Sequence, residues 1–236
     1  MKMPETLPDF LTDPNAVLKD SVDWRHGQVP DYSAANAKYA SERTVLHSQD
    51  SLEQRVTCLV KNWEKEVSFK QHLKDFRTMA PGWWVTVNGG RKFTLPDVLE
   101  QGSYNALIGE QAFFCSSKLG FEESHRTFRR AMPTGFAWEV LDVWSGPPKV
   151  AFKWRHWGKM TGQLHCPLSN GMTIIAQPTM EQHGMSGCAL ARLDADFRME
   201  SLELYFDQQQ PMASMVSDLV RLFDSFELAE SLPGVS

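Results

Sequence analysis

Hydrophobic and polar residues alternate most regularly between Phe136 and Trp157, in two runs that are rich in β-branched and aromatic side chains. Such runs are typical of β-strands. Between them lies Ser145-Gly146-Pro147-Pro148, and glycine and proline favour chain reversals and end strands. The pattern therefore predicts a β-hairpin with strands Phe136–Trp144 and Lys149–Trp157.

The expected four-residue loop fixes which side chains share a face of the hairpin. Glu139 then lies opposite Trp154 and Ala137 opposite His156, and opposed residues share a face. The drier face carries Glu139, Leu141, Val143, Val150, Phe152, Trp154 and His156. A loop one residue longer or shorter would place Glu139 and His156 on opposite faces.

On the drier face, Glu139 and His156 are predicted to be diagonal neighbours, with side-chain roots about 7–8 Å apart. A direct or water-mediated hydrogen bond can span that distance. Burial raises the pKa of a carboxyl group and lowers that of an imidazole, whereas pairing opposes both shifts, so the pair could transfer protons near neutral pH. The alternative interpretation is that Glu139 only satisfies the hydrogen bonding of a buried His156.

Helical periodicity is strongest in the first half of the chain. Ser51 and Gln54 form a capping-box pattern ahead of hydrophobic residues spaced three and four apart, which predicts a helix over residues 50–67. The same spacing continues and predicts a second short helix over Val67–Arg77. A third helix is predicted to begin at Thr94.

Strand patterns dominate the second half. We predict further strands at Trp83–Val87, Thr173–Gln177, Met185–Leu193 and Arg198–Asp207, an extended segment at His125–Ala131, and a closing helix at Met212–Phe226. Helices first and long antiparallel strands afterwards indicate an α+β fold, in which a curved sheet wraps over helices.

Residues 1–45 differ in character from the rest of the chain, because they are polar and are interrupted by four prolines. We expect an N-terminal arm or lid over residues 1–45, one domain over residues 46–228 and a flexible tail over residues 229–236. Trp24 is predicted to plug into the body of the domain or to cover the mouth of a pocket.

Composition narrows the function classes. The net charge is −5 and no Lys/Arg run occurs, so we expect no nucleic-acid partner. No run approaches the roughly 18 apolar residues of a membrane span, and no signal-peptide core segment opens the chain, so we expect a cytoplasmic protein. The four cysteines lie far apart, potential metal ligands lack a recognised spacing, and there is no Gly-rich phosphate loop. We therefore expect no metal and no other cofactor.

Aromatic and methionine side chains are plentiful, with eight Trp, 14 Phe and 11 Met among 236 residues. They suit a cavity for a sizeable apolar ligand, although a large core uses the same residues.

Several motifs identify a family. They are DWRHGQVPDY, SLEQRVTCLVKNWEKE, VNGGRK, Tyr104-Asn105, HRTF, GFAWEVLDVWSGPP, FKWRHWG and ELYFD, and together they span residues 24–207. In these motifs the chain resembles the pathogen-related proteins of plants and their fungal relatives, in the SnoaL-like group of the NTF2-like superfamily. The resemblance implies a cone of antiparallel strands around a pocket, commonly in a homodimer packed through the sheet. It also implies cofactor-free proton transfer, as in the related polyketide cyclases, scytalone dehydratase, ketosteroid isomerase and limonene-epoxide hydrolase.

The candidate catalytic residues are His156, Glu139, Asp207, Tyr205 and His125. Asp207 is included because SnoaL-like proteins often place a cavity acid at the end of the last strand, and Tyr205 because a phenol can donate to a developing oxyanion. Both could instead lie on a solvated face, and His125 could be a strand-end histidine bonded to backbone. The candidate substrate-binding residues are Trp154, Phe152, Trp63, Trp24 and Tyr104.

Two functions remain open from the sequence. The first is a cofactor-free cyclase, isomerase or dehydratase, possibly pericyclic, that acts on a polyketide- or terpenoid-like secondary metabolite. The second is a non-catalytic protein that binds a hydrophobic ligand or acts in a stress or pathogen response.

Overall fold

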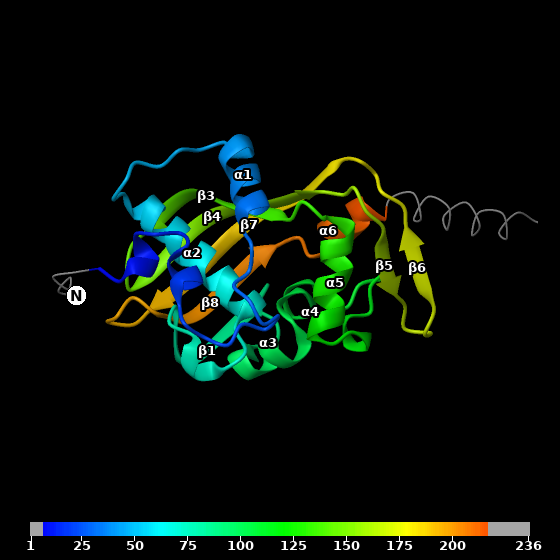
Figure 1. The fold of residues 1–236 in the computed structure, drawn as a ribbon, viewed down its shortest axis with the longest axis horizontal. Coiled ribbons are helices and arrows are strands. Elements are labelled where there is room, and N and C mark those ends of the chain that lie inside the picture. Colours follow the sequence, from blue (N-terminus) through cyan, green and yellow to red (C-terminus); the bar gives the residue numbers. More distant parts are fainter. Residues whose placement is uncertain (1–6, 217–236) are drawn as a thin grey trace, which may run out of the picture.

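The computed structural model describes residues 7–216, which form a curved sheet wrapped around helices (Figure 1). The strands of this sheet run in the order β2-β1-β8-β7-β4-β3. They are β1 (Met79–Val87), β2 (Phe93–Thr94), β3 (Phe136–Ser145), β4 (Lys149–Lys159), β7 (Gln182–Leu193) and β8 (Met199–Phe206). Neighbouring strands are antiparallel except β1 and β8, which pair in parallel. The predicted α+β fold with a curved sheet over helices is confirmed.

Helices cover the concave side and one end of the sheet. They are α1 (Ser33–Glu42), α2 (Leu52–Phe69), α3 (Leu95–Gln101), α4 (Ser103–Ile108), α5 (Phe121–Ala131) and α6 (Gln209–Met215), with short 3₁₀ helices at Asp9–Leu11, Ala16–Lys19, Leu73–Asp75 and Ser116–Lys118. Figure 1 shows α2 lying across the sheet and α3, α4 and α5 gathered at one end of it. Beyond that end stands a separate hairpin, β5 (Leu164–Pro167) and β6 (Thr173–Ala176).

Helix α2 is the helix that the sequence predicts most clearly. The Ser51 hydroxyl accepts a hydrogen bond from the Gln54 amide, as a capping residue does. The hydrophobic stripe of α2 packs into the main core, which also contains Val85 of β1 and Leu202 of β8. Burial of this stripe, more than helix propensity, holds α2 against the sheet.

The second helix predicted over Val67–Arg77 is wrong. Helix α2 continues to Phe69 and ends at Lys70, after which only the short 3₁₀ turn Leu73–Asp75 forms. The ammonium group of Lys70 is buried between the carboxylates of Glu66 and Asp20, 2.7 Å from each. The Lys70 ammonium also donates a hydrogen bond to the Asp75 carbonyl, so the chain after Lys70 turns back over this buried charge. Local spacing does not reveal the contact with Asp20.

The extended segment predicted at His125–Ala131 is also wrong, because these residues form the end of helix α5. Phe121, His125 and Phe128 are buried along one side of α5, at helical spacing. The polar residues Ser124 and His125 within the buried stripe hid this period from the sequence pattern.

The predicted hairpin is confirmed, but its register is shifted by one residue. His156 pairs with Trp138 and Arg155 pairs with Glu139, so Glu139 and His156 lie on opposite faces of the sheet. Five residues separate the last pair, Ser145 and Ala151, where four were expected, which changes the face that each side chain occupies. Two bulges on β3 then each move the register by one residue. Strand β4 lies between β3 and β7 and pairs with β7 over eleven consecutive residues without a bulge. The bulges therefore occur on β3, the edge strand.

The N-terminal arm is bonded to the domain at several places, and two of these attachments flank residues 26–41. In the first part of the arm, the Asn62 side chain of α2 donates hydrogen bonds to the carbonyls of Phe10 and Asp13 and accepts one from the Val17 amide. At the end of the arm, the Glu139 carboxylate of β3 accepts hydrogen bonds from the Thr44 and Val45 amides. Residues 26–41 lie between the two attachments.

The remaining elements agree with the sequence in part. Thr94 caps α3 in a capping box with Asp97, as predicted. Helix α6 covers the start of the predicted closing helix Met212–Phe226, and the rest of that helix and the tail 229–236 lie outside the described residues. Among residues 7–216, the helices are too short or too polar to cross a membrane.

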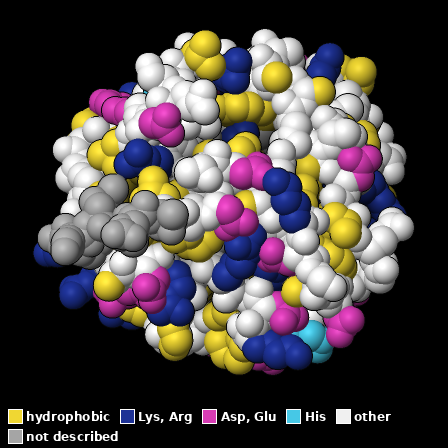
Figure 2. Space-filling view, turned by 60° about the vertical axis from the view of Figure 1, so that its left-hand side comes forward, with side chains coloured by type: hydrophobic (Ala, Val, Ile, Leu, Met, Phe, Trp, Pro, Cys, Tyr) yellow, Lys and Arg dark blue, Asp and Glu magenta, His cyan; other side chains and the backbone are white. Residues whose placement is uncertain are grey.

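Figure 2 turns the side of the molecule at the left of Figure 1 toward the viewer. Basic and acidic side chains are interspersed there with small hydrophobic patches. This face therefore presents no large region of a single charge.

Candidate functional site

A cavity of about 430 Å³ lies between the concave face of the sheet, helices α2, α4 and α5, and the N-terminal arm. Its floor is aromatic and apolar, with Phe136, Trp138, Trp154, Leu204 and Phe206 from the sheet. The arm closes one side with residues between His26 and Ala35. This volume is within the usual range for pockets that hold small organic molecules.

His156 lies in the floor of the cavity, where its ring packs between two aromatic rings. The ring centroids of Phe136 and Trp138 are each 4.9 Å from that of His156. Burial lowers the pKa of His156 to about 3, so the imidazole is neutral at physiological pH. Among residues 7–216 no hydrogen-bond partner reaches His156. A neutral base therefore faces the cavity, free to bond a ligand.

Trp154 pairs with Val140 and lies beside Trp138, with ring centroids 4.7 Å apart. The adjacent strand makes room for its indole at Gly187, where a Cβ atom would lie 2.9 Å from the Trp154 ring. A side chain at that position would displace the floor of the cavity.

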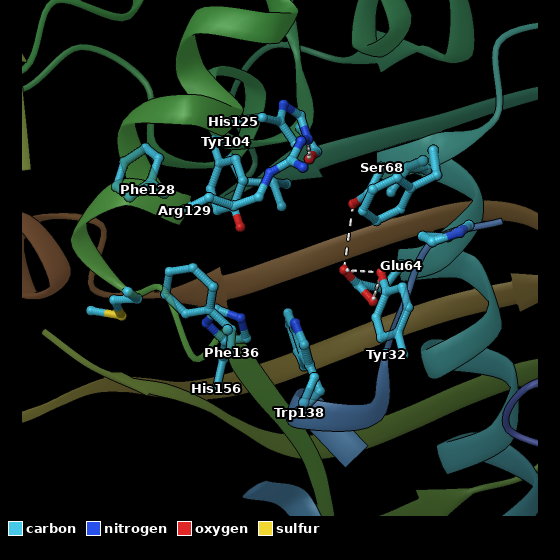
Figure 3. A pocket seen from close by; sticks show the side chains of 18 of the residues that line it. Tyr32, Glu64, Ser68, Tyr104, His125, Phe128, Arg129, Phe136, Trp138 and His156 are labelled. Carbon is cyan, nitrogen blue, oxygen red and sulfur yellow. Dashed lines mark hydrogen bonds between the residues drawn. The ribbon is translucent and has the colours of Figure 1, made fainter. Parts of the chain in front are cut away.

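Glu64 projects into the cavity from α2 and is bonded to the arm. The Tyr32 hydroxyl lies 3.0 and 2.9 Å from the two carboxylate oxygens of Glu64, and the Ser68 hydroxyl is 3.4 Å from one of them (Figure 3). Burial raises the pKa of Glu64, and the hydrogen bond from Tyr32 partly opposes the shift.

Sequence reasoning missed Glu64. The helical spacing could have indicated that Glu64 faces the interior. It lies four residues after Val60 and three before Val67, on the side of α2 that carries these buried residues. An acid at such a position faces the interior and needs a partner, here Tyr32 from the arm.

Tyr104 and His125 form the wall that α4 and α5 contribute. The Tyr104 ring stacks on Phe128 with centroids 4.6 Å apart, and Figure 3 shows its hydroxyl directed into the cavity. Burial raises the pKa of Tyr104, so the phenol keeps its proton and can donate it in a hydrogen bond.

His125 lines the cavity but is already bonded within the protein. Its Nδ1 donates to the Phe121 carbonyl at 2.8 Å, and its Nε2 lies 3.4 Å from the Ser103 hydroxyl. Burial lowers its pKa to about 3. Close packing of α5 on the α3–α4 junction depends on Gly102, which has a φ of +92° and where a Cβ atom would lie 2.6 Å from the Ser124 hydroxyl.

The structure separates Glu139 from the cavity. Its side chain is 1% exposed, lies on the outer face of the sheet, and forms an ion pair of 2.8 Å with Arg155. The predicted diagonal contact between Glu139 and His156 is therefore wrong. The alternative, in which Glu139 satisfies His156, is wrong for the same reason.

Four other predicted residues also lie outside the cavity lining. Asp207 accepts hydrogen bonds from the Gln209 and Gln210 amides at the start of α6, and Tyr205 is 43% exposed and donates to Glu203. Phe152 is packed in the main core. Trp24 is buried where its backbone pairs with Lys70, so it fills the body of the domain and does not cover the mouth.

His183 is a further cavity residue that the sequence did not indicate. Its ring nitrogens contact the hydroxyls of Thr179 and Ser214, which fix the orientation of the imidazole. Within residues 7–216, no three His, Cys, Asp or Glu side chains are grouped closely enough to hold a metal ion.

Taken together, the cavity combines an apolar floor with groups that can accept or donate a proton. His156 is a neutral acceptor, Tyr104 a donor, and Glu64 an acid whose pKa is raised. Such groups can move a proton between two positions of an enclosed organic molecule.

Comparison with known proteins identifies relatives of this chain. No family model matches it. It is 31% identical to the pathogen-related protein of Hordeum vulgare over 204 residues, which cover 82% of this chain and 82% of the relative.

Solved structures with a similar arrangement are more distant. A presumed SnoaL-like polyketide cyclase from Jannaschia is 14% identical, with a TM-score of 0.39, over 72% of this chain and 97% of its own. An NTF2-like protein of unknown function from Cytophaga hutchinsonii is 8% identical, with a TM-score of 0.33, over 66% of this chain and 100% of its own. The family assignment rests on the plant relative, and this chain belongs to the pathogen-related protein family.

Proposed function

We propose that this protein is a cofactor-independent enzyme that transfers protons within a small organic substrate held in the cavity. The observation that carries the proposal is His156, a neutral imidazole with no protein partner among residues 7–216, which faces the cavity beside an aromatic floor. A histidine in the core is normally satisfied by hydrogen bonds. A substrate that forms a hydrogen bond with the imidazole of His156 would supply the missing partner.

The proposed chemistry is general acid–base catalysis. His156 accepts a proton from a carbon or hydroxyl of the substrate, and the Tyr104 hydroxyl donates a hydrogen bond to the oxygen on which negative charge develops. With a pKa of about 3, His156 is a weak base in the empty cavity, so the proposal requires that the negative charge developing beside it stabilise the imidazolium and raise this pKa. Glu64 supplies or receives the second proton, so the substrate is isomerised, cyclised or dehydrated without an external oxidant. Positioned acid–base groups contribute about 10²–10⁴-fold, and the shape of the cavity can supply more by folding the substrate.

The size and lining of the cavity favour a polyketide- or terpenoid-like substrate. The floor offers flat aromatic surfaces from Trp138 and Trp154, and the volume of about 430 Å³ suits a molecule of two or three fused rings.

The test is proton exchange in deuterated water. β-Polyketone, terpenoid ketone and terpenoid epoxide candidates are incubated with the protein, and mass spectrometry records deuterium incorporation and product formation. We expect His156→Gln to lower the rate at least about 100-fold while the dissociation constant of the same compound changes less than about threefold. The matched control is His165→Gln, because His165 contacts Arg130 outside the cavity lining. Full turnover by the His156 variant would refute the assignment.

A second candidate is a non-catalytic protein that stores or transports a hydrophobic ligand. It is favoured by the bonding of Glu64 and His125, since the Tyr32 hydroxyl lies within hydrogen-bond distance of both carboxylate oxygens of Glu64 and protein groups contact both nitrogens of His125. A double variant, Glu64→Gln with His156→Gln, separates the two functions. A carrier keeps its ligand affinity in this variant, and its wild type exchanges no deuterium.

A further inference from the structure

Arg129 enters the cavity lining from the last turn of α5. Among residues 7–216, no Asp or Glu oxygen lies within 4.0 Å of its guanidinium group. Its contacts are His26, 3.4 Å from one guanidinium nitrogen, and the Phe69 ring, whose centroid lies 5.4 Å away. Neither contact is a carboxylate, so the guanidinium group, which lines the cavity and is also exposed to solvent, is left to bond water or a ligand.

A nearby arginine shows the contrast. Arg25, in the arm, lies 3.5 Å from a carboxylate oxygen of Glu122 and packs over the Phe121 ring. Arg25 is not among the cavity-lining residues, whereas Arg129 is. The unpaired arginine is therefore the one that reaches the cavity.

Tyr104 adds a hydrogen-bond donor at the same wall. Figure 3 shows Arg129 beside Tyr104 on the α5 side of the cavity. Burial and the charge of Glu64 raise the pKa of Tyr104, and the positive charge of Arg129 lowers it by a smaller effect. Within residues 7–216 the Tyr104 hydroxyl has no hydrogen-bond partner. A guanidinium group and a phenol together form a site for an anionic oxygen, since both donate hydrogen bonds and the guanidinium fork matches a carboxylate or sulfonate.

Glu64 occupies a different part of the cavity. Figure 3 shows it with Tyr32 and Ser68 on the α2 side, away from the wall that carries Arg129 and Tyr104. The cavity thus has one end suited to an anion, another with a carboxyl group, and an apolar floor between them.

We propose that the ligand of this cavity is an amphiphilic organic anion, whose aromatic or polycyclic body lies on Trp138 and Trp154 and whose single carboxylate, sulfonate or phenolate group is bound by Arg129 and Tyr104. The proposal rests on the proposed function only in placing the ligand in the same cavity. The proposal further specifies that the ligand is negatively charged and that it lies in the cavity with its anionic group toward α5.

Two matched probes test the proposal. 1-Anilinonaphthalene-8-sulfonate is an anion, and N-phenyl-1-naphthylamine has the same rings without the sulfonate. Binding is measured by quenching of tryptophan fluorescence on the folded, full-length protein, and competition between the probes establishes that they share one site. We expect Arg129→Gln to weaken the sulfonate probe by about tenfold or more and the neutral probe by less than about twofold.

The control is Arg126→Gln, which removes the same charge from α5 at an exposed position outside the cavity lining. It should leave both probes unchanged. Tyr104→Phe should weaken the sulfonate probe selectively and by a smaller factor, because it removes one neutral donor.

Three results would overturn the proposal. They are equal losses in the Arg129 and Arg126 variants, equal effects of Arg129→Gln on both probes, and failure of the wild type to bind the sulfonate probe. None of these measurements involves turnover. Loss of the sulfonate probe in Arg129→Gln, combined with full activity of His156→Gln, would retain the anion site and reject the proposed catalytic role.

Discussion

Trp138 and His156 face each other directly across β3 and β4, and their ring centroids lie 4.9 Å apart. This pairing puts the histidine on an aromatic floor and leaves Glu139 on the outer surface of the sheet. Within the described part of the chain no carboxylate therefore acts on the imidazole, and burial lowers its pKa.

Acid stability follows from the two buried cavity histidines. Burial lowers the pKa values of His125 and His156 to about 3, against about 6.5 in an unfolded chain. The unfolded state therefore binds more protons below pH 6.5, so stability is complete above that pH and falls as the pH decreases toward 3. At pH 5 each histidine should cost about 2 kcal/mol. Urea unfolding at pH 7 and pH 5 measures the loss, and His156→Gln should remove about half of it; an unchanged pH dependence would contradict the prediction.

Glu139→Gln should destabilise the fold without reducing catalysis. The substitution removes the charge that pairs with Arg155 and weakens the attachment of the Thr44 and Val45 amides, so we expect a loss of about 2–4 kcal/mol in the free energy of unfolding. Glu200→Gln is the matched control, because its ion pair with Arg192 is exposed and should contribute less than about 1 kcal/mol. Urea titration compares the two. A stable Glu139 variant with lost turnover would instead support the catalytic role first predicted for Glu139.

Tyr32→Phe should speed ligand entry if the arm acts as a lid. Tyr32 is the hydrogen-bonded link between the arm and Glu64, and its loss removes two contacts to that carboxylate. We expect the association rate of N-phenyl-1-naphthylamine to rise by about threefold or more, since one such bond contributes about 1 kcal/mol. Stopped-flow fluorescence measures the rate. Tyr39→Phe, in helix α1, which begins directly after Tyr32, but outside the cavity lining, should show the wild-type rate, and identical rates in all three proteins would reject the lid.

A homodimer packed through the sheet remains a prediction from the family resemblance. Its natural surface is the outer face of β7 and β8, where the exposed Tyr205 pairs with Cys188. Sedimentation equilibrium should give about twice the chain mass of 26.8 kDa, and Tyr205→Lys should lower the apparent mass. A monomer at high protein concentration would exclude this assembly.

Local sequence signals were sufficient for the elements that depend on neighbouring residues. The cap at Ser51, the capping box at Thr94 and the reversal after Ser145 all involve groups within a few positions of each other. The core residues of α2 were predicted for the same reason.

The residues of the site could be predicted only in part. Their positions depend on strand pairing and on contacts between residues far apart in the sequence. Trp63, Tyr104, His125, Trp154 and His156 do line the cavity. The register of β3 depends on bulges that fit it to β4, and β4 is itself held by β7. The contact of Tyr32 with Glu64 joins residues 32 positions apart, and no local pattern indicates it.

The arm is attached on both sides of residues 26–41. The cavity lining therefore has two parts, one from the sheet and helices of the domain and one from this stretch of the arm. His156, Tyr104 and Glu64 belong to the sheet and helices of the domain, whereas His26, Pro30 and Ala35 belong to the arm. Residues 26–41 belong to neither hydrophobic core cluster and form no strand pair among the described residues, although α1 packs against β3. We therefore expect ligand preference to follow this short segment, and a chimera that exchanges it should carry the preference of its donor.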